Sequence, residues 1–122
     1  MPLSLKRLQR SFKYAMHGLV YVFKNEQNFR IQLTIGLVVI LAILFFKVQA
    51  WQAIVLLMLI TLVLVLELIN TIFERIIDIL KPRIHSYVEI IKDIMAAAVL
   101  IASFGATVIA LLIFLPYFLA LF

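Results

Sequence analysis

Residues 51–66 read WQAIVLLMLITLVLVL and carry no charged side chain. Two further apolar stretches, residues 31–46 and 94–114, lie before and after them in the chain. A helix needs about 20 apolar residues to cross a bilayer, and each stretch reaches that length once its flanks are included. Beside the first stretch, Lys47 can snorkel and Trp51 can anchor at the interface. The chain is therefore predicted to contain three transmembrane helices.

The composition also favours a membrane protein. Of the 122 residues, 66% are hydrophobic and 14% are charged, whereas soluble domains contain roughly 45–50% apolar residues. Such a chain has too little polar surface to cover a small water-exposed globule. The absence of cysteine and the presence of only three glycines exclude disulfides, thiolate chemistry and a glycine-rich phosphate loop. We expect a single integral membrane domain over residues 1–122.

The distribution of charge predicts the orientation in the membrane. The net charge is +5, and apart from Lys47 every basic residue lies before Ile31 or between Arg75 and Lys92. Basic residues mark the cytoplasmic side of membrane proteins. We therefore expect the N-terminus and the loop at residues 81–83 to be cytoplasmic, and Lys47 and the C-terminus to lie outside.

Residues 1–28 are predicted to form an amphipathic surface helix, with the transmembrane helices in residues 29–122. At about 100° per residue, one stripe holds basic and imidazole side chains, namely Lys6, Arg10, Lys13 and His17. The opposite side holds Leu5, Leu8, Phe12, Met16, Leu19 and Phe23. Such a helix lies in the headgroup layer, where anionic lipid contributes roughly 1 kcal/mol per Lys or Arg. The stripe is short and adjoins a membrane span, so we expect no nucleic-acid partner. The predicted fold class is all-α.

The second transmembrane helix is predicted to run from near Gln52 towards Pro82. At 1.5 Å per residue it is roughly 43 Å long, which exceeds the ~30 Å hydrocarbon core. Its cytoplasmic part carries polar residues at i, i+3, i+7 and i+11, a spacing that places them on one face. This acidic stripe consists of Glu67, Asn70, Glu74 and Asp78, with Thr71 beside it.

Further polar residues are expected near the acidic stripe. Glu26 precedes the first span, and His85, Glu89, Lys92 and Asp93 lie at the start of the third. We expect a candidate site at the cytoplasmic interface that brings together Glu26, Glu67, Asn70, Glu74, Lys92 and Asp93. Carboxylates without cysteine suit Mg²⁺, and metal ions, cations and a carboxylate base are the groups that phosphoryl transfer uses. A site at the membrane surface favours a lipid hydroxyl as acceptor.

Two other hypotheses stay open on the residues alone. The acidic cluster could bind or transport divalent cations without turnover. Alternatively, Glu67, Asn70 and Glu74 could only hydrogen-bond neighbouring helices, as in a structural subunit, although such contacts contribute only about 0.6 kcal/mol on average.

The segment from Glu67 to Asp78 resembles the E-x-x-N-[ST]-x-x-E-x-x-x-D signature of the small prokaryotic diacylglycerol kinase family. Other parts of residues 7–115 resemble the family in order and without gaps. They are Asn25-Glu26 with Phe29, His85, Lys92-Asp93 followed by Ala96-Ala97-Ala98-Val99, and Arg10-Ser11-Phe12 with Ala15 and Gly18.

The resemblance implies a homotrimeric lipid kinase of the bacterial cytoplasmic membrane that uses ATP and Mg²⁺. By position it makes Glu67 the general base, and it places Ala96 with Glu67 at the lipid substrate. It makes Glu26 and Glu74 the metal ligands. The residues that it implies for ATP binding are Arg7, Tyr14, Glu26, Asn70, Glu74, His85, Lys92 and Asp93.

Two positions depart from the family pattern. Ile72 and Met95 stand where the family has small residues, and larger side chains change how closely membrane helices approach. These departures concern the shape of the lipid pocket. The acceptors known in the family are diacylglycerol and undecaprenol, and the ending Leu112-Ile-Phe-Leu-Pro116 resembles that of undecaprenol kinases.

Overall fold

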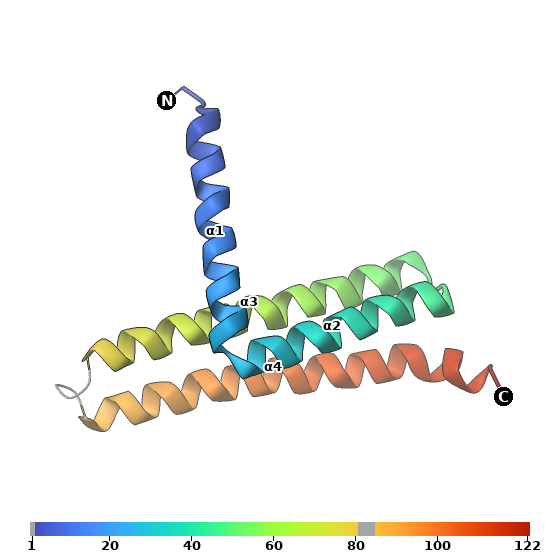
Figure 1. The fold of residues 1–122 in the computed structure, drawn as a ribbon. Helices are drawn as coiled ribbons and strands as arrows, with labels where there is room; N and C mark the ends of the chain where they lie inside the picture. The colour runs from blue at the N-terminus through green and yellow to red at the C-terminus, as the bar shows by residue number, and fades with distance from the viewer. Residues whose placement is uncertain (1, 81–84) are drawn as a thin grey trace.

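The computed structural model describes residues 2–80 and 85–122, which form four helices. They are α1 (Leu5–Asn25), α2 (Gln27–Phe46), α3 (Ala50–Leu80) and α4 (His85–Leu119). Figure 1 shows α2, α3 and α4 lying lengthwise side by side, while α1 stands away from this bundle. The three helices of the bundle are long and apolar enough to cross a membrane. The predicted all-α fold with three spans is confirmed; the loop at residues 81–83 lies outside the described residues.

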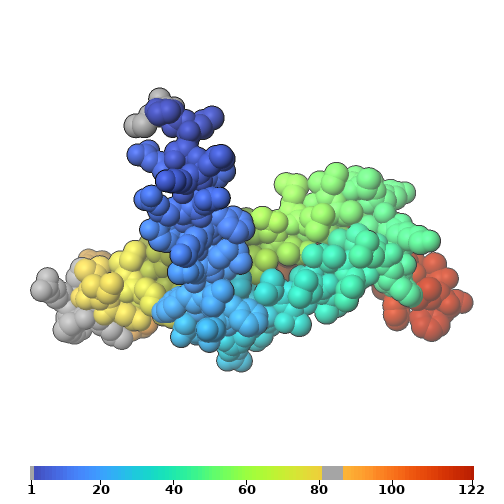
Figure 2. Space-filling view, turned by 45° about the horizontal axis from the view of Figure 1, so that its top comes forward, coloured from blue at the N-terminus to red at the C-terminus, as the bar shows by residue number. Residues whose placement is uncertain are grey.

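Helix α1 begins after Ser4, whose hydroxyl oxygen accepts a hydrogen bond from the backbone N–H of Arg7 at 3.4 Å. Such a cap satisfies one of the donors that a helix start leaves free. Leu8 and Phe12, on the apolar side, and all the basic residues up to Lys24 are exposed in this protomer. Figure 2 shows α1 as a column that joins the bundle only at its base. Its apolar face is therefore free to enter a lipid surface.

The chain turns at Glu26, where the backbone is extended with φ −118 and ψ 109. The carbonyl groups at the end of α1 accept hydrogen bonds from the Arg30 guanidinium, at 2.7 Å from Phe23 and 3.0 Å from Lys24. A cation at a helix C-terminus is also favoured by the helix dipole. The surface helix thus ends at Asn25, three residues earlier than the sequence predicted, and Glu26 lies at the corner between α1 and α2.

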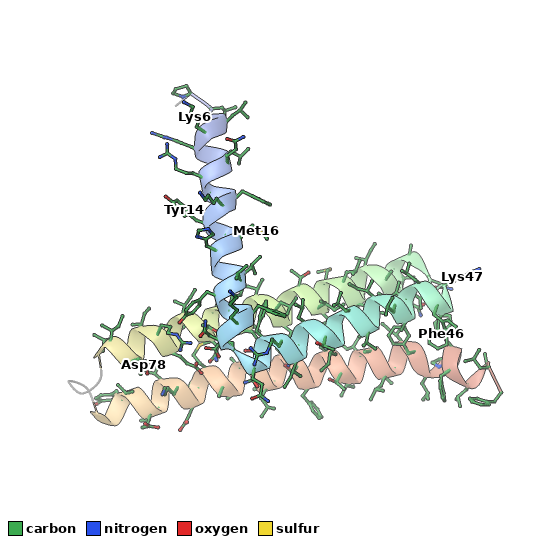
Figure 3. The ribbon with its side chains drawn as sticks, in the orientation of Figure 1. Lys6, Tyr14, Met16, Phe46, Lys47 and Asp78 are labelled. Carbon is green, nitrogen blue, oxygen red and sulfur yellow. The ribbon has the colours of Figure 1, made fainter. Side chains whose placement is uncertain are left out.

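The two ends of the bundle differ in charge and in contacts. Figure 3 shows Phe46 and Lys47 at one end and Asp78 towards the other. Lys47 ends α2 in a left-handed conformation with φ 52. At this same end the Tyr117 hydroxyl donates to Gln52 Oε1 and joins α4 to α3. Midway along, Gln32 Nε2 donates to Ser103 Oγ at 3.2 Å and joins α2 to α4.

Gly36 is a buried residue of α2 that packs against Ile60 of α3. A Cβ added there would stand 3.0 Å from Ile60 Cγ2, so a larger side chain crowds Ile60, and either that side chain or the helix backbone must shift. We expect Gly36→Leu to destabilise the bundle by about 1–3 kcal/mol, as overpacking does elsewhere. Thermal unfolding in detergent micelles measures this. Gly105→Leu is the matched control, since a Cβ there meets nothing within 4 Å; equal effects at both positions would contradict the prediction.

Candidate functional site

The site is built around Glu67 of α3, which is 3% exposed in this chain. Val63 and Thr71, four residues before and after it, are also buried, at 6% and 4% exposure. Residues four apart share one face of a helix, so α3 turns this face towards its neighbours. The Thr71 hydroxyl donates to the Glu67 carbonyl at 3.0 Å. The hydrophobic face of α3 thus carries one carboxylate into the bundle.

Two other carboxylates lie near Glu67. The charges of both Glu26 and Glu74 act on it, with Glu26 coming from the corner after α1 and Glu74 lying two turns further along α3. Asn70 Nδ2 donates to Glu74 Oε1 at 3.2 Å. Like charges at this range repel one another, and a cation placed among them is favoured. The corner at Glu26 and the acidic stripe of α3 thus lie on the same side of the bundle, close enough for their charges to interact.

The sequence did not single out Arg75, yet it makes the strongest contact of the site. Its Nη2 lies 2.6 Å from Glu26 Oε1, and its Nε donates to the Tyr21 hydroxyl at 2.9 Å. The same guanidinium lies 5.7 Å from the centre of the Tyr21 ring. One sequence signal pointed to this residue, because Arg75 is the only basic residue between Glu67 and Asp78.

Glu26 and Glu74 fit a magnesium ion by their chemistry. Mg²⁺ binds one or two carboxylates and completes its shell with water and phosphate oxygens. Glu26 and Glu74 supply two carboxylates, and the Asn70 side-chain oxygen is a third hard donor beside them. Within the described ranges, no three His, Cys, Asp or Glu side chains converge as a ligand set. A metal ion held by Glu26 and Glu74 would therefore need water or phosphate oxygens to complete its shell.

Among the described side chains, no hydrogen bond or ion pair joins Lys92, Asp93, Arg7 or Tyr14 to this cluster. On α4, Lys92 is half-buried, and Asp93 and Ala96 are exposed. Arg7 and Tyr14 are exposed on α1, and Figure 3 shows Tyr14 about midway along that helix, away from the bundle. His85 begins α4, but its side chain lies outside the described residues.

The two departures from the family pattern occupy different surroundings. Ile72 is 56% exposed and points away from its own bundle, so it does not set the spacing of helices within the protomer. Met95 is half-buried on α4. The unusual size of Ile72 therefore affects only what covers the outer side of α3.

A cavity of about 360 Å³ lies between α2, α3 and α4. Its lining is largely apolar and includes Gly36, Val63 and Phe114, with Gln32 and Ser103 as polar members. Val63 is the lining residue of α3 that lies nearest to Glu67 in the sequence, one helical turn away, and Glu67 itself does not line the cavity. Its volume is in the range of ligand-binding pockets.

Several proteins of known activity are similar in sequence to this chain. A diacylglycerol kinase of Synechocystis sp. is 37% identical over 112 residues, which are 91% of this chain and 64% of that protein. An undecaprenol kinase of Bacillus subtilis is 29% identical over 112 residues, 92% of this chain and 91% of the relative. For a diacylglycerol kinase of Haemophilus influenzae the identity is 32% over 98 residues, 80% of this chain and 83% of the relative. This chain thus spans less than two thirds of the Synechocystis protein but most of the other two.

A model of a whole protein family also matches this chain, and the matched residues contain the structural features described above. The model of the prokaryotic diacylglycerol kinase family matches residues 13–114, which contain the corner at Glu26, the acidic stripe and all three membrane-spanning segments up to Phe114. Arg7 lies before the matched range. With its three apolar helices and its acidic cluster in that range, this chain is a membrane protein that belongs to the prokaryotic diacylglycerol kinase family.

Proposed function

We propose that this protein is a lipid kinase that transfers the γ-phosphate of ATP to the hydroxyl of a membrane lipid alcohol. The observation that carries the proposal is the position of Glu67. It is buried beside two other carboxylates and lies one turn from the apolar cavity. A lipid whose chain enters that cavity would present its polar end to Glu67.

Glu67 acts as the general base in this proposal. Its carboxylate takes the proton of the lipid hydroxyl while that oxygen forms a bond to the γ-phosphorus. The bond from this phosphorus to the bridging oxygen breaks, and ADP leaves. Phosphoryl transfer requires mainly positioning and charge stabilisation, so a single carboxylate with access to both the lipid and the nucleotide is sufficient.

Glu26 and Glu74 are proposed to hold Mg²⁺, which when bound neutralises charge on the phosphates. Asn70, Lys92 and Asp93 are proposed to contact the nucleotide together with His85, Arg7 and Tyr14, and Ala96 to contact the lipid. Because α1 stands away from its own bundle (Figure 3), Arg7 and Tyr14 would reach a nucleotide at a neighbouring subunit more readily than at their own. We propose a homotrimer from the family resemblance, and the position of α1 is compatible with sites between subunits.

The site is proposed to face the cytoplasm of the bacterial cell, with the chain in the cytoplasmic membrane. Lys47 and Asp78 lie at opposite ends of the bundle (Figure 3), and apart from Lys47 every basic residue lies before Ile31 or between Arg75 and Lys92 in the sequence. Positive residues remain on the cytoplasmic side. The N-terminus would then be cytoplasmic and the C-terminus outside, so that the site faces the ATP pool.

A direct assay tests the proposed function. The purified protein in mixed micelles is incubated with γ-labelled ATP, Mg²⁺ and either undecaprenol or diacylglycerol. We expect label in the lipid with at least one alcohol and none when Mg²⁺ is removed by a chelator. The alcohol that is labelled faster assigns the protein to cell-wall carrier or phospholipid metabolism. If the protein binds divalent cations but neither alcohol becomes labelled, the kinase proposal is wrong and a cation-binding module is favoured.

A further inference from the structure

Arg75 occupies a position that the family signature leaves open, directly after Glu74. Its guanidinium contacts Glu26 and Tyr21, which places a cation on one of the two carboxylates proposed to bind Mg²⁺. Asp78 Oδ2 is 4.0 Å from Nη1, too far for a hydrogen bond. Arg75 thus has one strong carboxylate partner, and its Nη1 has N–H groups to spare among the described residues.

The contact is accessible from outside the protein. The side chains of Arg75 and Glu26 are 39% and 19% exposed, so the guanidinium lies at the mouth of the site, whereas Glu67 lies inside. Water weakens an ion pair at this exposure. A partner with more charge could therefore take the guanidinium away from Glu26 without opening the bundle.

A metal–nucleotide complex provides such a partner. A divalent ion on Glu26 would repel the guanidinium, while the phosphates that accompany the ion would attract it. Guanidinium groups bind phosphate through two parallel hydrogen bonds, which are among the strongest that proteins form. Both effects move Arg75 in the same direction, from the carboxylate to the phosphate.

We propose that Arg75 is a further phosphate-binding residue of the site, which pairs with Glu26 until a metal–nucleotide complex arrives. This assignment rests on the proposed function. In the nucleotide-free protein, Arg75 offsets the repulsion among the three carboxylates and competes with free metal for Glu26. In the complex it binds a phosphate and leaves Glu26 to the metal. The residue thereby favours metal that arrives together with nucleotide.

The competing explanation is a structural brace. Arg75 joins α3 to Tyr21 in the last turns of α1 and to Glu26 at the corner, so it would orient α1 without contacting any ligand. Loss of such a structural contact would disturb the whole site and weaken the binding of every ligand. If Arg75 exchanges partners, its loss should raise the affinity for free metal and lower the affinity for the metal–nucleotide complex. These opposite changes separate the two explanations.

The test measures Mn²⁺ binding to the full-length protein in micelles by electron paramagnetic resonance, with and without a non-hydrolysable ATP analogue. For Arg75→Gln we expect free Mn²⁺ to bind at least about threefold more tightly, because a competing cation is gone. We expect the Mn²⁺–nucleotide complex to bind about 10-fold more weakly, because a charged hydrogen-bonding partner is lost. Arg75→Lys keeps the positive charge but lacks the paired N–H donors of the guanidinium. Its affinities in both titrations should lie between those of wild type and Arg75→Gln.

Two control variants complete the test. Arg30→Gln removes the other arginine of the corner, whose guanidinium donates to two backbone carbonyls among the described residues, and Tyr21→Phe removes the hydroxyl that Arg75 binds. Both should leave the ratio of the two affinities near that of wild type. Any result for Arg75→Gln other than the opposite-signed pair overturns the assignment, including a loss of both affinities. A wild-type protein that binds Mn²⁺ but no nucleotide would instead overturn the proposed function.

Discussion

Glu67→Gln is expected to reduce phosphoryl transfer to the lipid by about 10²- to 10⁴-fold, the range that loss of a general base produces. Glutamine has nearly the same shape, so the packing around this 3% exposed side chain should be kept. The amide cannot accept the proton of the lipid hydroxyl. The loss should therefore appear in kcat, while the KM for ATP changes little. Initial rates with labelled ATP and saturating lipid measure it.

Glu89→Gln is the matched control for this prediction. Glu89 is an exposed acid on α4, and the same substitution there should leave the rate unchanged. Binding of a nucleotide analogue to Glu67→Gln, measured by calorimetry, should stay close to wild type. Turnover that persists in Glu67→Gln would show that another group accepts the proton.

Glu26→Gln and Glu74→Gln are each expected to raise the Mg²⁺ concentration needed for half-maximal activity by about 10-fold or more. An amide is a much weaker ligand for Mg²⁺ than a carboxylate. Glu74→Gln retains an oxygen that can accept the hydrogen bond from Asn70, so its defect should be confined to the metal. Glu26→Gln also loses the ion pair with Arg75 and should affect thermal stability as well.

A Mg²⁺ titration of the lipid kinase rate measures both effects, and Mn²⁺ binding in the presence of nucleotide gives a second readout without turnover. Glu89→Gln again serves as the control. A structural role for these acids would lower the unfolding temperature and leave the metal requirement unchanged. That result at both positions would remove Glu26 and Glu74 from the metal site.

Periodicity alone accounted for much of the site. Glu67, Asn70 and Glu74 fall on one stripe because a helix repeats every 3.6 residues, and the second span was expected to be continuous because nothing interrupts it between Gln52 and Leu80. The structure has the helix at Ala50–Leu80. The predicted boundary of the surface helix was three residues too late, because the contacts of Arg30 with the end of α1 join residues several positions apart.

The apolar lengths and the spacing of polar residues are local properties, so the sequence was enough to define the number of spans and the face that carries the acids. Contacts between helices depend on how each helix is rotated and shifted against its neighbour. This rotation and shift are determined by the packing of side chains that are far apart in the sequence. The ion pair of Arg75 with Glu26, the cavity beside Val63 and the bond from Gln32 to Ser103 are of this kind. They became visible only in the tertiary structure.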